Sequence, residues 1–315
     1  MKISAKQFFG CIVISACMLV CACAGVVDNG KKSATEVSDS TKKDSKKSTS
    51  QLDPSKSALV KINNRLFNVP SPMQLAGLLK DTELPFNKSL LSNTANCQNY
   101  TTSLKQALNI GVYGADLGYI NVYEQLPEAA AYFGAIRTLS TELGILNSFS
   151  DQTMQRIERN NGNKDSLLYI ISLIYRESDY YLMNSDRNEI SALILAGGWV
   201  ESVYLMTNAE QKISSDKKLK QLIGEQKHPL NNLIELLRPY YGKLSNESFD
   251  TFLENLSDLA GIFDEVNFKY TFKNVETNPE KKLTVINSES QTNLDNTQLK
   301  LIKDKVAKLR TDIIQ

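Results

Sequence analysis

The chain has 315 residues, with 36 Lys and Arg against 35 Asp and Glu, and a formal net charge of +1. This balance excludes the concentrated basic face of a nucleic-acid binder, so no nucleic-acid partner is expected. The single histidine, His228, excludes most zinc sites and most Ser-His or Cys-His triads, so we expect no catalytic triad, metal or cofactor.

Residues 1–23 have the layout of a bacterial lipoprotein signal. Lys2 and Lys6 form a positive start, residues 8–22 are apolar, and a small residue precedes Cys23. The apolar run is shorter than the ~20 residues that a membrane-spanning helix needs. We therefore predict cleavage before Cys23 and acylation of that cysteine, which would anchor the protein to a membrane by lipid alone. Cys17, which also follows a small residue, is the alternative site.

Residues 24–57 are rich in Ser, Thr, Lys and Asp and poor in aromatic and branched apolar side chains. Such a composition cannot bury a core, so we predict a flexible tether. A tether of this length spans ~30 Å on average. No acidic run follows Cys23 directly, which favours an outer-membrane position facing the periplasm, with surface exposure as the alternative.

Residues 58–315 are long enough to bury a substantial core, and we expect a single helical domain with terminal hairpins and a C-terminal helix. The segment opens with two strand-like runs, Leu59–Ile62 and Leu66–Val69, around Asn63-Asn64, a pair suited to a tight turn. Ser71 is then placed to cap a helix that has Pro72 at its first position.

Helical spacing dominates from there to about residue 265. Apolar and small residues fall three and four apart from Leu104 through Gly111 and Tyr119 to Val122. Further helices are predicted over Glu128–Leu146, Leu167–Leu182, a segment through Leu193 and Tyr204 capped by Asp186 with Glu189, Lys217–Glu225, Leu230–Tyr241 and Ser248–Val266.

Near the end the period changes to two, where Phe268, Tyr270 and Phe272 alternate with polar residues. A turn at residues 277–280 leads to a strand over Leu283–Ile286. The last segment, from Thr297, carries an apolar stripe of helical period that should dock on its own domain. We therefore predict a mainly α fold: a multi-helix bundle with a small β element made from hairpins near both ends, the two hairpins joining in one sheet.

Two stretches of the predicted core resemble each other. Gly111-Val-Tyr-Gly-Ala-Asp-Leu-Gly-Tyr119 aligns without gaps on Ala196-Gly-Gly-Trp-Val-Glu-Ser-Val-Tyr204. Each has small residues for one turn, then an acid, then a tyrosine three residues later, which places carboxylate and phenol on one helix face. Glycine in a helix interior costs ~1 kcal/mol relative to alanine, so these glycines predict a close approach of neighbouring helices.

The acids of these two stretches are the candidate site. If they face each other, they could hold a cation, an amine or a reacting water. The residues proposed to bind a ligand are Asp116, Tyr119, Trp199, Glu201 and Tyr204. The favoured alternative is structural, with each acid bonded to a tyrosine hydroxyl or to one of three arginines. Those arginines are Arg137, Arg176 and Arg187.

Several strings in the body occur in the order seen in a known group of proteins: Lys61–Pro72, Gly111–Tyr119, Gly162–Ser166 and Ala196–Glu201. In these, the chain resembles a family of uncharacterised, mostly α-helical exported lipoproteins of the Bacteroidetes, over about residues 58 to 210. The resemblance implies an envelope location and a helical fold. The family has no assigned activity, so no site residue is carried over from it.

Three classes of function remain open. The first is a non-enzymatic envelope lipoprotein that acts as a scaffold or protein-interaction module, favoured by the absence of catalytic motifs. The second is a helical small-molecule or lipid-binding module with a pocket near Asp116 and Glu201. The third is an enzyme that relies on carboxylates alone.

Overall fold

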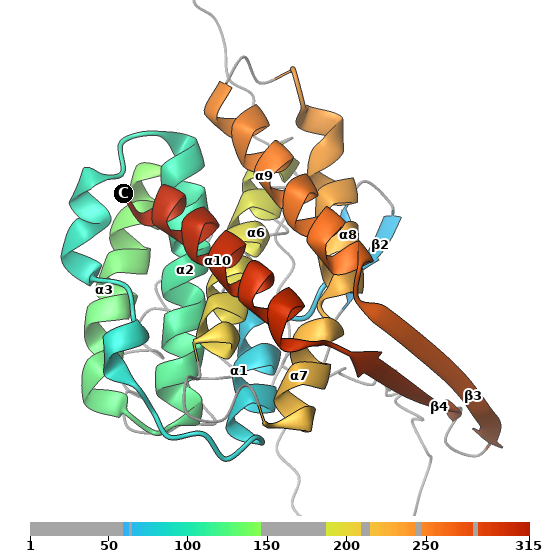
Figure 1. The fold of residues 1–315 in the computed structure, drawn as a ribbon. Helices are drawn as coiled ribbons and strands as arrows, with labels where there is room; N and C mark the ends of the chain where they lie inside the picture. The colour runs from blue at the N-terminus through green and yellow to red at the C-terminus, as the bar shows by residue number, and fades with distance from the viewer. Residues whose placement is uncertain (1–58, 63–64, 146–186, 209–214, 244–246, 280–282) are drawn as a thin grey trace, which may run out of the picture. The chain divides into compact units, whose positions relative to one another are not determined.

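The computed structural model describes residues 59–62, 65–145, 187–208, 215–243, 247–279 and 283–315 (Figure 1). The predicted signal, the tether and the helix predicted over Leu167–Leu182 lie outside these residues. The described part contains eight α-helices and two β-hairpins, so the predicted mainly α class with hairpins near both ends is confirmed.

The N-terminal elements follow the local sequence signals. Strands β1 (Leu59–Ile62) and β2 (Arg65–Asn68) pair antiparallel, the last residue of β1 opposite the first of β2, which confirms the two-residue connection. Helix α1 (Pro72–Lys80) begins with a reciprocal cap. The Ser71 hydroxyl accepts from the Gln74 N–H at 3.3 Å, and the Gln74 side chain accepts from the Ser71 N–H at 2.8 Å.

Two long helices form the first half of the core. Every residue of α2 (Ser103–Val122) except Ser103 and Lys105 is buried. Helix α3 (Leu126–Glu142) packs along α2. The prediction that this helix continues to Leu146 is wrong, because Gly144 adopts a φ of +71°, which ends the helix. Two short 3₁₀ segments lead into α2: η2 (Lys88–Leu90) and η3 (Thr94–Asn99).

Helix α6 (Asn188–Thr207) is the central element. It is long and apolar enough to cross a membrane by length and composition, yet 89% of that window is buried inside the fold. It contacts α1, α2, α7, α8 and α10. The structure places Arg187 at the N-cap, and the Arg187 side chain makes no capping hydrogen bond. The capping box predicted for Asp186 with Glu189 depends on Asp186, which lies outside the described residues.

The backbones of α2 and α6 touch at their glycines, as predicted. A Cβ atom on Gly111 would lie 2.0 Å from the Ile194 carbonyl oxygen, and one on Gly197 would lie 1.9 Å from the Leu108 carbonyl oxygen. No side chain fits at those distances. Gly118 is different, since a Cβ there would be 3.5 Å from Met73, an ordinary contact.

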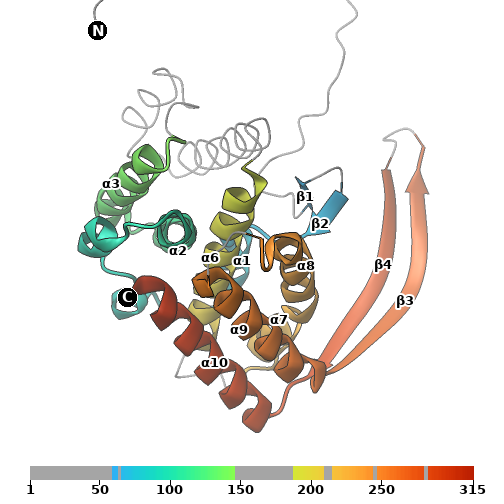
Figure 2. The same cartoon turned by 90° about the horizontal axis from the view of Figure 1, so that it is seen from above.

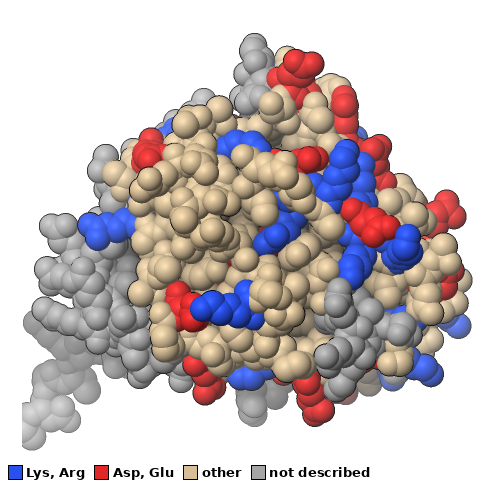
Figure 3. All heavy atoms as spheres, turned by 60° about the vertical axis from the view of Figure 1, so that its left-hand side comes forward, with Lys and Arg blue, Asp and Glu red and all other residues tan. Residues whose placement is uncertain are grey.

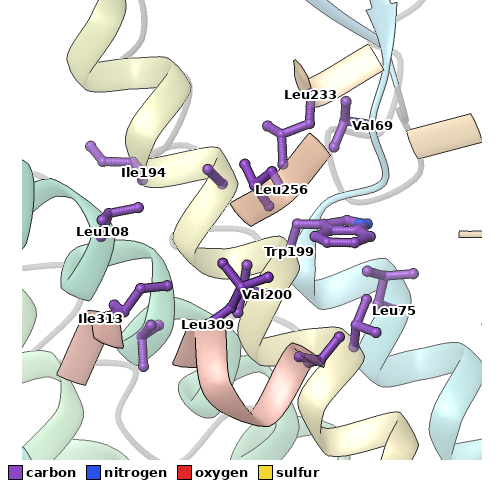
Figure 4. Packing of buried hydrophobic residues seen from close by; sticks show 14 of the residues in the cluster. Val69, Leu75, Leu108, Ile194, Trp199, Val200, Leu233, Leu256, Leu309 and Ile313 are labelled. Atoms are coloured by element: carbon purple, nitrogen blue, oxygen red, sulfur yellow. The ribbon is translucent and has the colours of Figure 1, made fainter. Parts of the chain in front are cut away.

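The C-terminal part covers the other side of α6. Its helices and strands are α7 (Lys217–Gly224), α8 (Lys227–Leu237), the 3₁₀ segment η5 (Arg238–Tyr240), α9 (Glu247–Asp264), β3 (Asn267–Asn278), β4 (Leu283–Asn293) and α10 (Asn296–Ile314). Figure 4 shows buried side chains of α1, α2, α8, α9 and α10 packed beside α6. The labelled ones from those helices are Leu75, Leu108, Leu233, Leu256, Leu309 and Ile313, and Val69, Ile194, Trp199 and Val200 are labelled with them. The apolar stripe of α10 is buried against its own fold, which confirms that prediction.

The two hairpins do not meet in one sheet. β1 and β2 form one two-stranded sheet, and β3 and β4 form another, so the predicted single sheet is wrong. β4 also runs to Asn293, well past the predicted end at Ile286. Helix α10 makes the long-range closure instead, because the Tyr100 hydroxyl donates to the Ile314 carbonyl at 3.0 Å. Figures 1 and 2 both show the β3–β4 hairpin running away from the helices.

Candidate functional site

The two acids singled out in the sequence meet in the core. Asp116 of α2 and Glu201 of α6 are both 0% exposed, and their carboxyl groups lie close enough for each to affect the pKa of the other. Asp116 follows Gly111 by five residues and Glu201 follows Gly198 by three. The same close crossing of α2 and α6 therefore brings both carboxyl groups into one buried space, and we call the two the acid pair.

Arg310 of α10 completes this cluster. Its Nε donates to Oε2 of Glu201 at 2.7 Å, and its Nη2 donates to the Ser92 hydroxyl at 2.8 Å and to the Leu90 carbonyl at 2.9 Å. The guanidinium carbon lies 4.0 Å from the centre of the Tyr204 ring, a cation–π contact. One side chain thus joins α10 to α6 and to the segment that precedes α2.

Ser92 links the cluster to a fourth helix, α3. Its N–H donates to Oδ2 of Asp116 at 2.9 Å, and its carbonyl accepts from the Tyr132 hydroxyl of α3 at 2.9 Å. Hydrogen bonds from α2, α3 and α10 therefore converge on one residue of a connecting segment. Such a network fixes a segment that has little regular structure of its own.

Burial dominates the electrostatics of the acid pair. It raises the pKa of Asp116 well above the ordinary range, and the neighbouring Glu201 raises it further, while the Ser92 N–H and Arg310 oppose the shift. Burial also raises the pKa of Glu201, against the attraction of Arg310. Burial alone would lower the pKa of Arg310, but the attraction of Glu201 outweighs it and raises that pKa.

The other two predicted site residues lie elsewhere. Tyr119 is buried, accepts from the Asn87 N–H at 3.0 Å and stacks on Phe86 with 5.1 Å between ring centres. Trp199 is fully buried and donates to the Gln226 side chain at 3.3 Å. The structure thus brings together Asp116, Glu201 and Tyr204, and it places Tyr119 and Trp199 in separate parts of the core.

The arginine partner was not among those predicted from the sequence. Arg187 donates instead to the Leu143 carbonyl at 2.8 Å, and Arg176 lies outside the described residues. Arg310 could have been found from its position, because it follows Val306 by four residues and precedes Ile313 by three, on the apolar face of α10. Ser92 and Tyr132 gave no such signal.

The cluster is closed to solvent as it stands. Both acids are 0% exposed and Arg310 is 9% exposed, so a substrate or ligand would reach Asp116 or Glu201 only if the surrounding elements moved. Among the described residues, no three His, Cys, Asp or Glu side chains are placed to hold a metal ion. Comparisons with known protein families, curated proteins and solved structures found no match to this chain.

Proposed function

We propose that the protein is a lipid-anchored, non-enzymatic scaffold of the cell envelope that binds a partner protein through the β3–β4 hairpin. The observation that carries this proposal is a concentration of exposed apolar side chains. Among the described residues, six large hydrophobic side chains are exposed, and three of them lie within six residues of β3. Tyr270 is 57% exposed, Phe272 56% and Val275 50%.

These three residues share one face of the hairpin, which we call the aromatic face. Tyr270 and Phe272 are two residues apart and so lie on the same side of the strand. The register then shifts at a bulge after Phe272. Phe272 pairs with Ser288, and Val275 pairs with Ile286. Positions 286 and 288 of β4 are two residues apart, so they lie on the same side of that strand. The bulge therefore returns Val275 to the side of the aromatic residues, and the apolar face continues across it.

The inner end of this hairpin is held by the helices. The Phe268 ring packs edge-on against His228 of α8, with 4.8 Å between ring centres. The Thr292 hydroxyl donates to the Gln221 carbonyl of α7 at 3.5 Å. The outer part of the hairpin is a two-stranded ribbon, and such a ribbon has little stability of its own in water. An apolar face that is anchored at one end and open at the other is typical of an interaction surface.

The chemistry of the hairpin favours a protein over a lipid surface. Tyr and Phe are enriched in the centres of protein interfaces. Residues 267–293 carry four lysines against three glutamates, so the hairpin offers only one net positive charge to anionic lipid. Lysines and a bulge in β3 also disfavour addition of a strand to its edge. We therefore propose that the partner protein binds to the aromatic face and not to the strand edge.

On the face drawn in Figure 3, acidic and basic side chains are intermixed around uncharged residues, so this face offers no patch of a single charge as a competing site. The alternative function, a small-molecule or lipid pocket at Asp116 and Glu201, has less support. Both acids are fully buried and bonded within the fold, and Trp199 and Tyr119 do not face them.

We include a membrane anchor in this proposal because the first 23 residues resemble a lipoprotein signal. Cleavage before Cys23 would leave a lipid-modified cysteine, and the predicted tether would hold the body near the membrane, facing the periplasm. Restriction to that surface raises the effective concentration of the hairpin for a partner in the same envelope. The outer membrane is the proposed location.

Site-specific photocrosslinking in the native host tests the proposed contact. A photoreactive residue replaces Phe272 in the full-length protein, and a matched control carries it at Thr271, exposed on the opposite face. We expect one discrete protein adduct from position 272 and none from position 271. Adducts only with a second copy of the chain, only with lipid, or at both positions alike would each contradict the proposal.

A further inference from the structure

We propose that Asp116 and Glu201 share one proton, and that this proton allows Arg310 to dock α10 on the core. The proposal is independent of the lipid anchor and of any partner protein. It rests on three observations: the unpaired oxygens of the acid pair, the charge of Arg310, which is the guanidinium that contacts the pair among the described residues, and the attachment of α10 to this cluster through Arg310.

Each acid has one oxygen that accepts a hydrogen bond and one oxygen that has no hydrogen-bond partner. Oδ2 of Asp116 accepts from the Ser92 N–H, and Oε2 of Glu201 accepts from Arg310. Oδ1 of Asp116 and Oε1 of Glu201 are fully buried and lack a hydrogen-bond partner as long as both groups are ionised. Two carboxylates can only accept. One proton between these two oxygens turns a repulsive contact into a bond that satisfies both.

The net charge of the cluster also points to one proton on the acid pair. With both acids ionised, the cluster would carry two negative charges against one positive charge, and an uncompensated buried charge is costly. With two protons, Arg310 would be buried without a counter-charge. One proton gives a neutral cluster, in which Glu201 keeps its charge for Arg310 and Asp116 donates to Glu201.

Among the described residues, the other titratable groups that interact with this cluster are phenols. Tyr113 of α2 and Tyr132 of α3 interact with the acid pair, and Tyr204 of α6 and Tyr100 after η3 interact with Arg310. Burial raises the pKa of Tyr100, Tyr113 and Tyr132. Those three phenols therefore stay protonated at neutral pH, and the proton of the acid pair is the one to be lost as pH rises.

Loss of this proton weakens the fold in a defined direction. Because the pKa of Asp116 is raised in the folded chain, its contribution to stability is complete below the unfolded pKa of about 3.9 and falls as pH rises through the folded pKa. Ionisation of both acids would place a second negative charge where only Arg310 compensates. Arg310 attaches α10 to this cluster through Glu201, Ser92 and Leu90, so we expect α10 to loosen first.

Infrared spectroscopy of the full-length protein tests the shared proton directly. A protonated carboxylic acid has a C=O stretch that a carboxylate lacks. We expect this band at pH 7 in the wild type and its loss in Asp116→Asn. We also expect its loss in Glu201→Gln, because the remaining Asp116 then becomes the counter-charge of Arg310. A band that persists in Glu201→Gln would show that burial alone protonates Asp116 and would overturn the proposal.

A folding measurement gives an independent readout. Between pH 5 and 8, the unfolding equilibrium constant of the wild type should rise relative to that of Asp116→Asn by up to about tenfold per pH unit. Hydrogen exchange should place the pH-dependent opening in α10. Asparagine can accept from the Ser92 N–H and donate to Glu201, so this variant should fold. Equal pH slopes in the two proteins, or no band in the wild type, would contradict the shared proton.

Discussion

Arg310 and Glu201 are 109 residues apart in the chain, yet Nε of the arginine lies 2.7 Å from Oε2 of the glutamate in the centre of the fold. Their contact joins the last helix, α10, to the central helix α6. It also explains why the charged Glu201 is tolerated in α6, a helix that is otherwise apolar over most of its length. The acid pair and its arginine are therefore a part of the core that the fold must keep neutral.

Removal of the arginine should be strongly destabilising. In Arg310→Met the methionine keeps much of the side-chain volume, but Glu201 stays buried without a counter-charge. We expect a loss of about 3–5 kcal/mol in the free energy of unfolding at neutral pH. The loss should shrink toward acidic pH, because burial raises the pKa of Glu201 and protonation then removes the uncompensated charge.

Lys305→Met in the same helix is the control, since its ion pair with Asp258 lies at the surface, where Asp258 is 68% exposed. Urea unfolding of both variants makes the comparison. Similar losses of stability in the two would contradict the role given to Arg310.

The glycine contacts of α2 and α6 predict a sharp difference between alanine variants. Gly111→Ala and Gly197→Ala place a methyl group about 2 Å from a backbone oxygen, so the helices must separate. Overpacking of this kind costs about 1–3 kcal/mol or more. In Gly134→Ala of α3, nothing lies within 4 Å of the new methyl group, and the variant should gain about 0.5–1 kcal/mol. Thermal unfolding distinguishes the two outcomes, and a loss in Gly134→Ala would show that the comparison is unsound.

The outer half of the hairpin should be dispensable for folding. Replacement of both Tyr270 and Phe272 by serine removes exposed side chains, so we expect the free energy of unfolding to change little. Phe263→Ala, at a fully buried position of α9, should cost about 3–5 kcal/mol. If the serine variant is destabilised to a similar degree, the aromatic face belongs to the fold and is not reserved for a partner.

The anchor makes a prediction that mass spectrometry can check. The mature protein from the native host should begin at Cys23 and carry acyl chains. Cys23→Ala should lose both the acyl mass and the membrane association, whereas Cys17→Ala should keep them. An unmodified start at any other residue would overturn the lipoprotein assignment without affecting the shared proton.

Much of the fold was readable from local sequence. The apolar periods of α2, α6 and α10 and the Ser71 cap are short-range patterns, and the helices that they predict appear in their places. The end of α3 was missed because Gly144 stops the helix although the apolar pattern continues.

The tertiary relationships were only partly readable. The glycines of α2 and α6 implied a close crossing, and the repeated acids pointed to Asp116 and Glu201. The choice of Arg310 depends on how α10 docks, which no local pattern states. Tyr119 shares the spacing of Tyr204, yet it turns to Phe86 because helix position alone does not fix which neighbour a side chain meets. For the same reason, the sequence could not tell that the two hairpins stay apart.

A double-mutant cycle on the acid pair tests the central claim most directly. Asp116→Asn and Glu201→Gln each leave one acid to balance Arg310, so we expect both single variants to fold with near wild-type stability at pH 7. The double variant leaves Arg310 buried without a counter-charge, and it should lose about 3–5 kcal/mol beyond the sum of the single changes. Additive effects in the cycle, measured by urea unfolding, would contradict the account of the two acids and Arg310 as one charge-balanced unit.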